Sequence, residues 1–337
     1  MYTKFSKPLS DILKIKSSFF QENQKLLKEN EKLLKFYKLQ PIRKLCKNCN
    51  YKLQKKNDFV SHDIGYKICK KCSHLNGKFQ DTKKYTDYCY KPKKNNYIKF
   101  YSKFYSKRVS KIYNPKVEFL INFLKKKKIK KNFILDIGCG AGHFLKSLEN
   151  KRIIGAGLET NVDMVKLGNA KLKKNKIFFS RDEEIIQKIK LSEANIISMI
   201  AVLEHLNNPS IFLKAIKQSK IKYFYASIPM VSLSVLIENL FQNVYPRQLC
   251  ATHTHLYTEK SIKYLLSKFG MKIVAEWWFG TDFLDLKRSF QLTSKKNNFE
   301  PQFILNSSIM NNIDSFQKIL DKKKNCSELH FIAKVNR

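Results

Sequence analysis

From residue 115 onward, short apolar segments alternate with segments whose apolar residues recur at helical spacing, and this alternation limits the fold more than any other feature of the chain. Strands are expected at residues 132–139, 152–159, 176–180, 194–204, 222–229, 271–282 and 328–335, and helices at 117–127, 141–151, 161–172 and 210–219. Such alternation is typical of a parallel sheet with helices on both faces. The sequence therefore predicts an α/β domain that binds ligands beyond the carboxyl ends of its strands.

The first expected strand ends in Asp136 and runs into three closely spaced glycines, Gly138, Gly140 and Gly142. Glycines at this density let a ligand approach the backbone closely. A dinucleotide-binding GxGxxG pattern would require a third glycine where this chain has His143, so a pyrophosphate ligand is not favoured. Glu159, at the end of the second expected strand, fits an acid that accepts hydrogen bonds from both hydroxyls of a ribose. These features together indicate S-adenosylmethionine as the ligand.

Several motifs occur in order at ordinary spacings: LDIGCGAGHF at 135–144, GLET at 157–160, VLEHLNNP at 202–209 and SIPM at 227–230. Together they resemble the class I S-adenosylmethionine-dependent methyltransferases. Within that superfamily the chain is most similar to the branch that includes ubiquinone-biosynthesis and sugar methyltransferases. The resemblance covers residues 115–285, and it implies a Rossmann-like sheet that is parallel except for an antiparallel last strand.

The resemblance also implies which residues bind the cofactor. Asp136 and the glycines would frame its methionine part, Glu159 would hold the ribose, and Asn161 would belong to the loop beside it. Asp182 would reach the adenine amine, although Arg181 stands beside it where such proteins often have a small residue. The expected cofactor-binding set is Asp136, Gly138, Gly140, Gly142, Glu159, Asn161 and Asp182.

A sulfonium methyl group is already electrophilic, so the protein mainly has to hold the acceptor in line, an effect of about 7 to 11 kcal/mol when the orientation is good. A carbon or oxygen acceptor also needs a proton acceptor with a pKa near the working pH, for which histidine is the natural choice. The expected catalytic residues are Glu204, His205, His253 and His255.

The sequence leaves other roles open for these residues. His205 could cap the turn before Asn207, and His253 and His255 could brace a lid through hydrogen bonds. Two imidazoles and a carboxylate can also ligate zinc, which makes Glu204, His253 and His255 a conceivable second metal site. Methyl transfer requires no Lewis acid, so the sequence does not favour that site.

Two CxxC pairs, Cys46 with Cys49 and Cys69 with Cys72, are separated by nineteen residues. This spacing matches structural zinc sites, in which four thiolates close a tetrahedron and leave no open position for catalysis. A module of this size has little core of its own, and zinc ligation, on the order of 10 kcal/mol, would replace the missing burial. The alternative is four unrelated buried thiols. His62 and His74 lie nearby and are interpreted as ordinary histidines.

The chain is expected to divide into an amphipathic helix or short coiled coil (1–40), a zinc-ribbon-like module (41–80), an aromatic and basic linker (81–114) and the methyltransferase domain (115–337). Apolar pairs recur every seven residues between 9 and 39, which fits either a helix packed on its own chain or a homodimer seam. Within the last domain, residues 230–256 are expected to form a lid, and 283–326 an insertion before the last strand.

The net charge is +39, but only seven of the 66 basic residues are Arg. Proteins that recognise phosphates and bases prefer Arg. The excess of Lys is therefore interpreted mainly as compositional drift of the whole proteome, and nucleic acid is not favoured as a partner. The tyrosines between 81 and 115 could stack on single-stranded nucleic acid, or they could lay their rings over the next domain. No signal peptide or membrane span is expected, and a cytoplasmic location is predicted.

The predicted function is S-adenosylmethionine-dependent methylation of a small-molecule acceptor. An N-terminal four-cysteine module before such a domain is also similar to certain sugar C-methyltransferases, which suggests a nucleotide sugar or a surface-polysaccharide precursor as acceptor. Two alternatives remain open: an RNA-directed methyltransferase that grips RNA with the zinc ribbon and the basic segments, and a scaffold that binds the cofactor without turnover. The expected cofactors are S-adenosylmethionine and a structural zinc ion.

Overall fold

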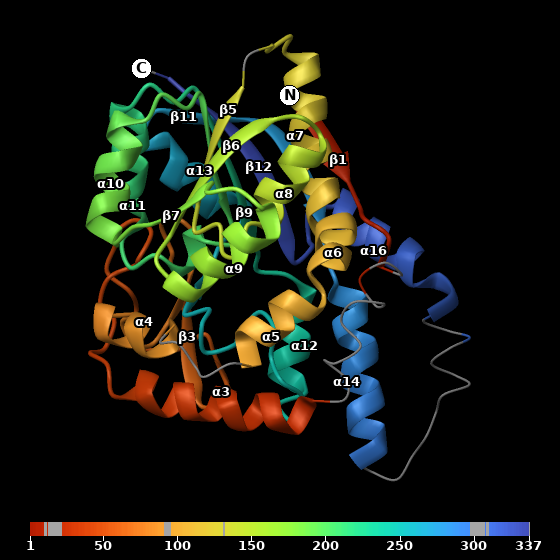
Figure 1. Ribbon diagram of the computed structural model, residues 1–337. Coiled ribbons are helices and arrows are strands. Elements are labelled where there is room, and N and C mark those ends of the chain that lie inside the picture. The colour runs from red at the N-terminus through yellow and green to blue at the C-terminus, as the bar shows by residue number, and fades with distance from the viewer. Residues whose placement is uncertain are drawn as a thin grey trace.

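The computed structural model describes residues 1–9, 12, 22–90, 96–130, 132–296, 307 and 310–336. Figure 1 shows a large sheet in the upper part of the molecule, and a small sheet with a long helix below it. Within the described residues, no helix combines the length and the apolar character that crossing a membrane requires.

The large sheet has the strand order β1-β11-β12-β9-β8-β5-β6-β7. Its parallel part consists of β5 (Phe133–Ile137), β6 (Ile154–Glu159), β7 (Ile177–Phe179), β8 (Ile196–Ile200) and β9 (Tyr223–Pro229). The last strand, β12 (Glu328–Val335), runs antiparallel between β9 and β11 (Met271–Phe279). The predicted α/β architecture, with its antiparallel last strand, is confirmed.

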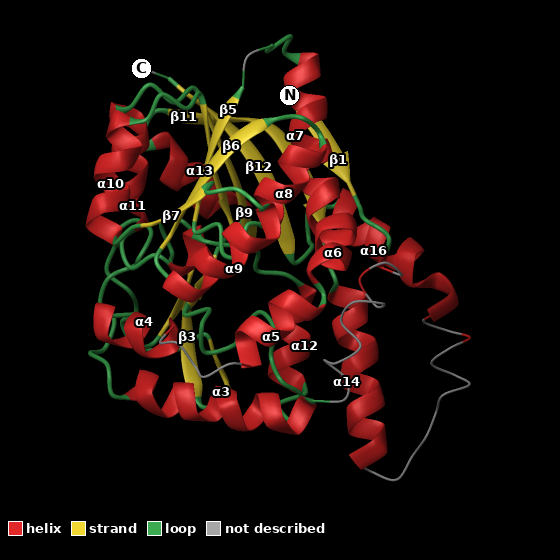
Figure 2. Ribbon diagram, viewed as in Figure 1, coloured by secondary structure: helices red, strands yellow, loops and turns green. Residues whose placement is uncertain are grey.

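Two layers of helices cover the large sheet (Figure 2). One face packs against α10 (Asp182–Leu191), α11 (Pro209–Gln218) and α13 (Glu259–Ser267) in a single apolar cluster. The other face packs against α7 (Asn114–Lys126), α8 (His143–Asn150) and α9 (Val162–Leu172). Trp277 and Trp278, which point to opposite faces of β11, are almost fully buried in these two clusters and so stabilise the core rather than line a pocket.

The second sheet joins the cysteine module to the domain that follows it. β2 (Phe59–Ser61), β3 (Ile64–Ile68) and β4 (Leu75–Gly77) are antiparallel neighbours in the module. The fourth strand, β10 (His255–Leu256), comes from the connection after β9 and pairs with β4. The module is thus built into the α/β domain by main-chain hydrogen bonds.

Helix α3 (Asn23–Lys38) is the described part of the amphipathic segment expected at 9–39. Its residues Leu34 and Tyr37 are buried in a cluster with Tyr66 and Leu75 of the small sheet. The Asn30 side chain accepts a hydrogen bond from the Ala251 backbone N–H at 2.8 Å. This part of the helix packs on its own chain, and a homodimer seam within 9–39 stays a prediction, since residues 10–11 and 13–21 lie outside the described residues.

The linker between the module and the sheet is helical, with α4 (Lys83–Tyr90), α5 (Asn96–Lys103), α6 (Tyr105–Arg108) and a π-helical turn η1 (Val109–Tyr113) before α7. The buried Tyr85 hydroxyl donates to the Ala251 carbonyl at 2.6 Å. Tyr105 and Tyr113 stack on the His143 ring, with centroids 4.4 and 5.2 Å away. These rings of the linker therefore lie against the domain that follows.

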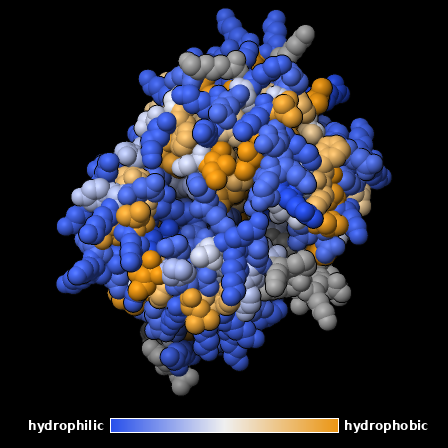
Figure 3. All heavy atoms as spheres, turned by 90° about the vertical axis from the view of Figure 1, so that its left-hand side faces the viewer, coloured by the Kyte–Doolittle hydropathy of each residue, from blue (hydrophilic) through white to orange (hydrophobic). Residues whose placement is uncertain are grey.

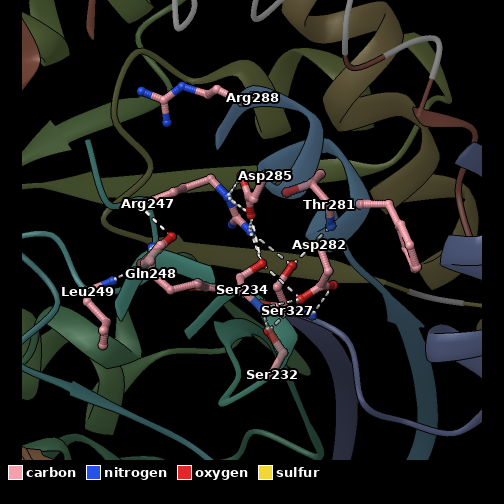
Figure 4. Close-up of polar contacts among 12 residues, drawn as sticks. Ser232, Ser234, Arg247, Gln248, Leu249, Thr281, Asp282, Asp285, Arg288 and Ser327 are labelled. Carbon is pink, nitrogen blue, oxygen red and sulfur yellow. Dashed lines mark hydrogen bonds and ion pairs between the residues drawn. The ribbon is translucent and has the colours of Figure 1, made fainter. Parts of the chain in front are cut away.

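Residues after β11 form α14 (Asp282–Lys296), the 3-10 turn η4 (Met310–Asn312) and α16 (Ile313–Lys322). Helix α14 packs beside α12 (Leu233–Leu240), which begins the predicted lid (Figure 1). Figure 4 shows the polar network that joins them, in which Asp282 accepts hydrogen bonds from Ser232 and Ser234 on one oxygen and from Gln317 and Ser327 on the other. Helix α12 is fixed by this buried carboxylate.

Two features depart from the sequence expectations. Residues Tyr2–Phe5 form β1, which extends the large sheet in parallel beside β11, although no strand is expected there from the sequence. The strand expected at 194–204 ends at Ile200, because Ala201 has a positive φ of 57° and turns the chain into the 3-10 turn η2 (Leu203–His205). This turn brings Glu204 and His205 to the carboxyl edge of the sheet.

Candidate active site

The glycine loop between β5 and α8 lies at the carboxyl edge of the large sheet. Gly138, Gly140 and Gly142 all have positive φ angles, of 63°, 54° and 71°. Residues with a side chain rarely adopt this conformation. A Cβ added at Gly138 would lie 2.7 Å from the Val202 side chain, whereas one at Gly140 would meet nothing within 4 Å. The loop therefore needs Gly138 for packing, and Gly140 faces open space that a ligand can fill.

Glu159 lies at the end of β6 and points into this loop. Its Oε2 accepts a hydrogen bond from the Gly140 N–H at 2.8 Å, and its Oε1 accepts from the N–H groups of Thr160 and Asn161, both at 2.9 Å. The Thr160 hydroxyl also donates to Oε1, at 3.4 Å, so acceptor capacity for a hydroxyl donor remains on Oε2, which has a single partner within the described part of the chain. The carboxylate is thus held in place beside the open side of Gly140.

The other two residues expected beside the cofactor are each at a helix start. The Asn161 side chain caps α9 by accepting from the N–H groups of Asp163 and Met164, so its amide oxygen is already used. Asp182 is the first residue of α10 and is exposed, next to Glu183, which pairs with Lys83 of the linker at 3.5 Å. Asn161 thus shapes the loop, while Asp182 is free of protein hydrogen bonds within the described residues.

Asp136 is buried at the end of β5, where its Oδ1 accepts a hydrogen bond from Ser198 at 2.7 Å. Burial raises the pKa of Asp136 to about 7, and the nearby Glu159 adds to the effect. Lys116 of α7 is also buried, and its positive charge lowers the pKa of Asp136 and so opposes the effect of burial. The same charge acts on Glu204, where it also opposes the rise in pKa that burial causes. Lys116 is therefore within electrostatic reach of both carboxyl groups.

Glu204, His205 and His253 form a second polar group at the same edge. One ligand atom from each lies within 4.8 Å of the others, and the rings of the two histidines stack with centroids 5.2 Å apart. His205 Nδ1 lies 3.2 Å from the Thr252 carbonyl, and His253 Nδ1 lies 3.1 Å from the Gln248 carbonyl. Glu204 is 3% exposed, and its Oε2 has no hydrogen-bond partner among the described residues.

The protonation of this group depends on its surroundings. Burial raises the pKa of Glu204 to about 7. Burial would lower the pKa of His253, but Cys250 and Glu204 outweigh it and raise that pKa to about 9, while the pKa of the Cys250 thiol falls to about 6. Burial and the neighbouring His253 lower the pKa of His205. Near neutral pH the group therefore holds both a proton donor and a neutral imidazole.

His255 lies apart from this group. It is fully buried in β10, and its Nδ1 is 2.9 Å from Nε2 of His74 in the cysteine module. The rings of His74 and His255 also contact Tyr257. The conceivable metal set of Glu204, His253 and His255, which the sequence did not favour, does not come together in this structure, and His205 lies beside Glu204 and His253 instead.

A small pocket lies between helix α4 and this polar group. It is lined by Glu204, His205, Thr252 and Thr254 on one side and by Asp81, Tyr85, Thr86, Cys89 and Tyr90 of the linker region on the other. The Tyr90 hydroxyl is 2.7 Å from His205 Nδ1. The linker thus provides one wall of the space beside the candidate catalytic residues.

The four cysteines of the module converge on one point. Cys46 Sγ lies 3.7 Å from Cys72 Sγ, and Cys49 Sγ lies 3.5 Å from Cys69 Sγ, with all four sulfurs within 4.8 Å of one another. A zinc tetrahedron with bonds of 2.3 Å has sulfurs about 3.8 Å apart, so these distances fit a metal and not a disulfide. Amide groups of Asn48 and Asn76 point at Cys72 and Cys46, as expected around thiolate ligands.

Sequence reasoning missed three residues that contact or polarise the candidate site: Tyr90, Lys116 and Cys250. Tyr90 is one of the aromatic residues of the linker, and the sequence does not indicate that it contacts His205. Cys250 precedes His253 by three residues, and this spacing was a signal for a thiol and imidazole pair. Lys116 directly precedes the helix expected at 117–127, and the sequence has no signal that its side chain is buried.

Comparison with protein-family models identifies a family for this chain. A family model described as a methyltransferase domain matches residues 107–276, about half of the chain. The comparison with curated proteins gives no match.

Solved structures with a similar fold include an S-adenosylmethionine-dependent methyltransferase from Archaeoglobus fulgidus, 22% identical over 71% of this chain and 100% of that one, with a TM-score of 0.46. Magnesium protoporphyrin IX methyltransferase from Synechocystis PCC 6803, solved with bound S-adenosylhomocysteine, is 13% identical over 68% of this chain and 87% of that one, with a TM-score of 0.44. On the match to the family model, this chain belongs to the methyltransferase-domain family and is an S-adenosylmethionine-dependent methyltransferase.

Proposed function

We propose that this enzyme transfers the methyl group of S-adenosylmethionine to a small acceptor, a nucleotide sugar or a surface-polysaccharide precursor. The observation that carries the proposal is the position of a buried carboxylate and imidazole group directly beyond the glycine loop, at one edge of the sheet. Val202, two residues before Glu204, packs on Gly138 and ties the two parts together. The acceptor class itself rests on the resemblance of the motifs to sugar methyltransferases.

In this proposal the cofactor lies along the open side of Gly140. The ribose hydroxyls donate to the Glu159 carboxylate, whose position is set by the main-chain N–H groups of the loop. Asp136 faces the methionine part of the cofactor, and Asp182 lies at the adenine end. Asn161 contributes by holding the start of α9 rather than by its own amide.

The acceptor atom that receives the methyl group lies beside Glu204, His205 and His253, and helix α4 forms a wall next to the first two of these residues. The lone pair of the acceptor atom forms a bond to the methyl carbon, while the electrons of the carbon–sulfur bond pass to sulfur and leave S-adenosylhomocysteine. The proton released by the acceptor passes to the carboxylate and imidazole group. His255 is fixed in the small sheet and supports the loop that carries His253.

We also propose that Cys46, Cys49, Cys69 and Cys72 bind a structural zinc ion. The sulfur distances support it, and four thiolates leave no open coordination position. The proposed units are the helix at 1–40, the module at 41–80, the linker at 81–114 and the catalytic domain at 115–337, with a lid at 230–256 and an insertion at 283–326. Thiolate ligands need a reducing compartment, so we place the enzyme in the cytoplasm.

Incubation with S-adenosylmethionine labelled in its methyl group tests the function. Candidate nucleotide sugars serve as acceptors and total RNA as the comparison. Label is expected in at least one nucleotide sugar, and Glu204→Gln should reduce its incorporation, while Glu193→Gln, on the exposed surface, should not. Label that appears in RNA and in none of the sugars would overturn the proposed acceptor class.

A further inference from the structure

The group formed by Glu204, His205 and His253 has the composition of a metal site as well as of a proton acceptor. Two imidazoles and one carboxylate are a common ligand set for zinc and for other divalent transition metals, which keep an open position for a substrate oxygen. All three side chains come from the carboxyl edge of the sheet, two from the turn η2 and one from the connection after β9. None of them belongs to the four-cysteine cluster.

The hydrogen bonds around the histidines favour metal binding through their outer nitrogens. A carbonyl oxygen can only accept, so the contact of His253 Nδ1 with Gln248 places a proton on that nitrogen. His205 Nδ1 faces the Thr252 carbonyl at 3.2 Å and the Tyr90 hydroxyl at 2.7 Å, and a proton on this nitrogen can be donated to both oxygens. The lone pair of each neutral ring is then on Nε2. Metal-binding histidines are nearly always oriented in this way, with the second ring nitrogen donating to a carbonyl or carboxylate.

The carboxylate adds a separate observation. Glu204 is 3% exposed, and its Oε2 has no hydrogen-bond partner among the described residues. A buried carboxylate oxygen without a partner is costly unless a cation or donor completes it. The other oxygen, Oε1, lies 3.9 Å from His205 Nε2.

We infer that Glu204, His205 and His253 bind one divalent transition-metal ion, which takes an oxygen of the acceptor as a further ligand. This inference rests on the proposed function, because the metal would bind the acceptor at the residues that the proposed function places beside it. Ligand atoms around a tetrahedral metal with bonds of 2.0 to 2.1 Å lie about 3.4 Å apart. The three atoms lie within 4.8 Å of one another, so relative shifts of at most about 1.4 Å (4.8 minus 3.4) would bring them to that spacing.

Metal binding would narrow the acceptor class. The ion would take the place of the proton on His253, and it would lower the pKa of a bound hydroxyl and orient its oxygen toward the methyl group. With the metal bound, the lone pairs of Glu204, His205 and His253 are occupied, so the hydroxyl proton leaves to water and not to these side chains. The oxygen lone pair bonds to the methyl carbon, and the carbon–sulfur electrons remain on sulfur. An acceptor with a hydroxyl beside a second oxygen donor, as sugars have, fits such a site.

Titration of the purified full-length protein, with its zinc in place, tests the inference. Mn²⁺ is the probe, because it prefers nitrogen and oxygen ligands and does not compete for a four-thiolate site. One Mn²⁺ is expected per chain, detected by calorimetry and by electron paramagnetic resonance. Glu204→Gln and His253→Gln should each weaken its binding at least about tenfold. His62→Gln, which alters a histidine outside the group, should leave it unchanged.

Binding of S-adenosylhomocysteine to the same proteins separates the possible failures. Variants that bind S-adenosylhomocysteine as the parent protein does, but have lost Mn²⁺, support the metal site and show that the fold is intact. No Mn²⁺ site in the parent protein, or equal Mn²⁺ binding by Glu204→Gln and His253→Gln, overturns the inference while leaving the methyltransferase function standing. Failure of the parent protein to bind S-adenosylhomocysteine contradicts the proposed function instead.

Discussion

Glu159 shows how one side chain can prepare a binding site before the ligand arrives. Three main-chain N–H groups hold its carboxylate at the open side of Gly140. Replacement of Glu159 by Gln keeps the size of the side chain. It places the amide NH₂, a hydrogen-bond donor, where backbone N–H donors now point. A charged hydrogen bond contributes about 1.5–3 kcal/mol, so Glu159→Gln should weaken S-adenosylhomocysteine binding about 10- to 100-fold.

Isothermal titration calorimetry measures this change. Glu193→Gln is the matched control, because that glutamate is exposed and its ion pair with Lys220, at 2.7 Å, lies on the solvated surface. Its affinity should equal that of the parent protein. An unchanged affinity in Glu159→Gln would show that the ribose hydroxyls do not reach this carboxylate.

Asp136 predicts a pH dependence of cofactor binding. Burial raises the pKa of this carboxyl group to about 7, so it is mostly neutral below pH 7 and mostly ionised above it. The ionised form attracts the positive sulfonium of S-adenosylmethionine, whereas S-adenosylhomocysteine has a neutral sulfur. The ratio of the two dissociation constants should shift in favour of S-adenosylmethionine by roughly three- to tenfold between pH 6 and pH 8.

Asp136→Asn should flatten this dependence, and Asp163→Asn, in the first turn of α9, should preserve it. The comparison matters because the pKa of Glu204 is also raised to about 7. A dependence that persists in Asp136→Asn would assign it to Glu204.

At the level of elements, the sequence predicted the sheet well and the connections poorly. Runs such as residues 133–137 and 223–229 are apolar over their whole length, so they could be recognised as buried strands. Strand β10 has two residues and no periodicity, and it depends on β4, which lies 180 residues earlier. For this reason THTHLYT was interpreted as a catalytic connection, and the separation of His255 from His253 could not be foreseen.

The end of β8 was missed for a local reason. The apolar run continues through Val202 and Leu203, so the pattern predicts a strand up to Glu204. The positive φ of Ala201 is a conformation that the sequence does not encode in a recognisable way, since alanine rarely adopts it. The turn it creates is what aims Glu204 and His205 toward His253.

The cysteine module is expected to depend on its metal. Chelation, or the Cys46→Ser variant, should lower the melting temperature by more than about 5 °C, since metal ligation contributes much of the folding energy of such modules. The effect should reach the catalytic domain, because β10 pairs with β4 and the Asn48 amide donates to the Ser261 carbonyl of α13 at 2.9 Å.

Metal analysis and thermal unfolding measure this dependence together. Cys89→Ser is the control, because Cys89 lies outside the cluster. It should retain one zinc ion per chain and nearly the parent melting temperature. A parent protein that contains no zinc and is insensitive to chelation would contradict the zinc assignment.

The network around Asp282 predicts a second element-scale effect. All the groups that contact its two oxygens are donors, from Ser232, Ser234, Gln317 and Ser327. Asp282→Asn would turn an amide donor toward these donors, and leaving a buried partner unsatisfied costs about 1–3 kcal/mol, more for charged groups. Denaturant unfolding should show a loss of this size, with Glu193→Gln close to the parent. Equal stability of both variants would mean that the network does not fix α12.

For the whole molecule, the sequence left the meaning of the +39 charge open between a nucleic-acid grip and composition. The face at the left of Figure 1 is largely hydrophilic in Figure 3, with apolar side chains in small separate groups, so polar residues cover it broadly rather than in one track. Such a surface should bind any polyanion without selectivity, and the binding should weaken steeply with salt. The protein is therefore expected to be retained about equally on RNA and on heparin at low salt.

Retention measured at about 50 and 200 mM salt tests this interpretation, because a protein that contacts 6–10 phosphates loses roughly 10³–10⁵ in affinity over that range. Release from both columns at the same salt concentration, with label transferred to no RNA, would support compositional drift as the origin of the charge. Retention on RNA at salt concentrations well above those that elute the protein from heparin requires contacts with RNA other than charge interactions. That result, together with methyl label in the RNA, would make the linker tyrosines and the cysteine module an RNA-binding surface and the acceptor a nucleic acid.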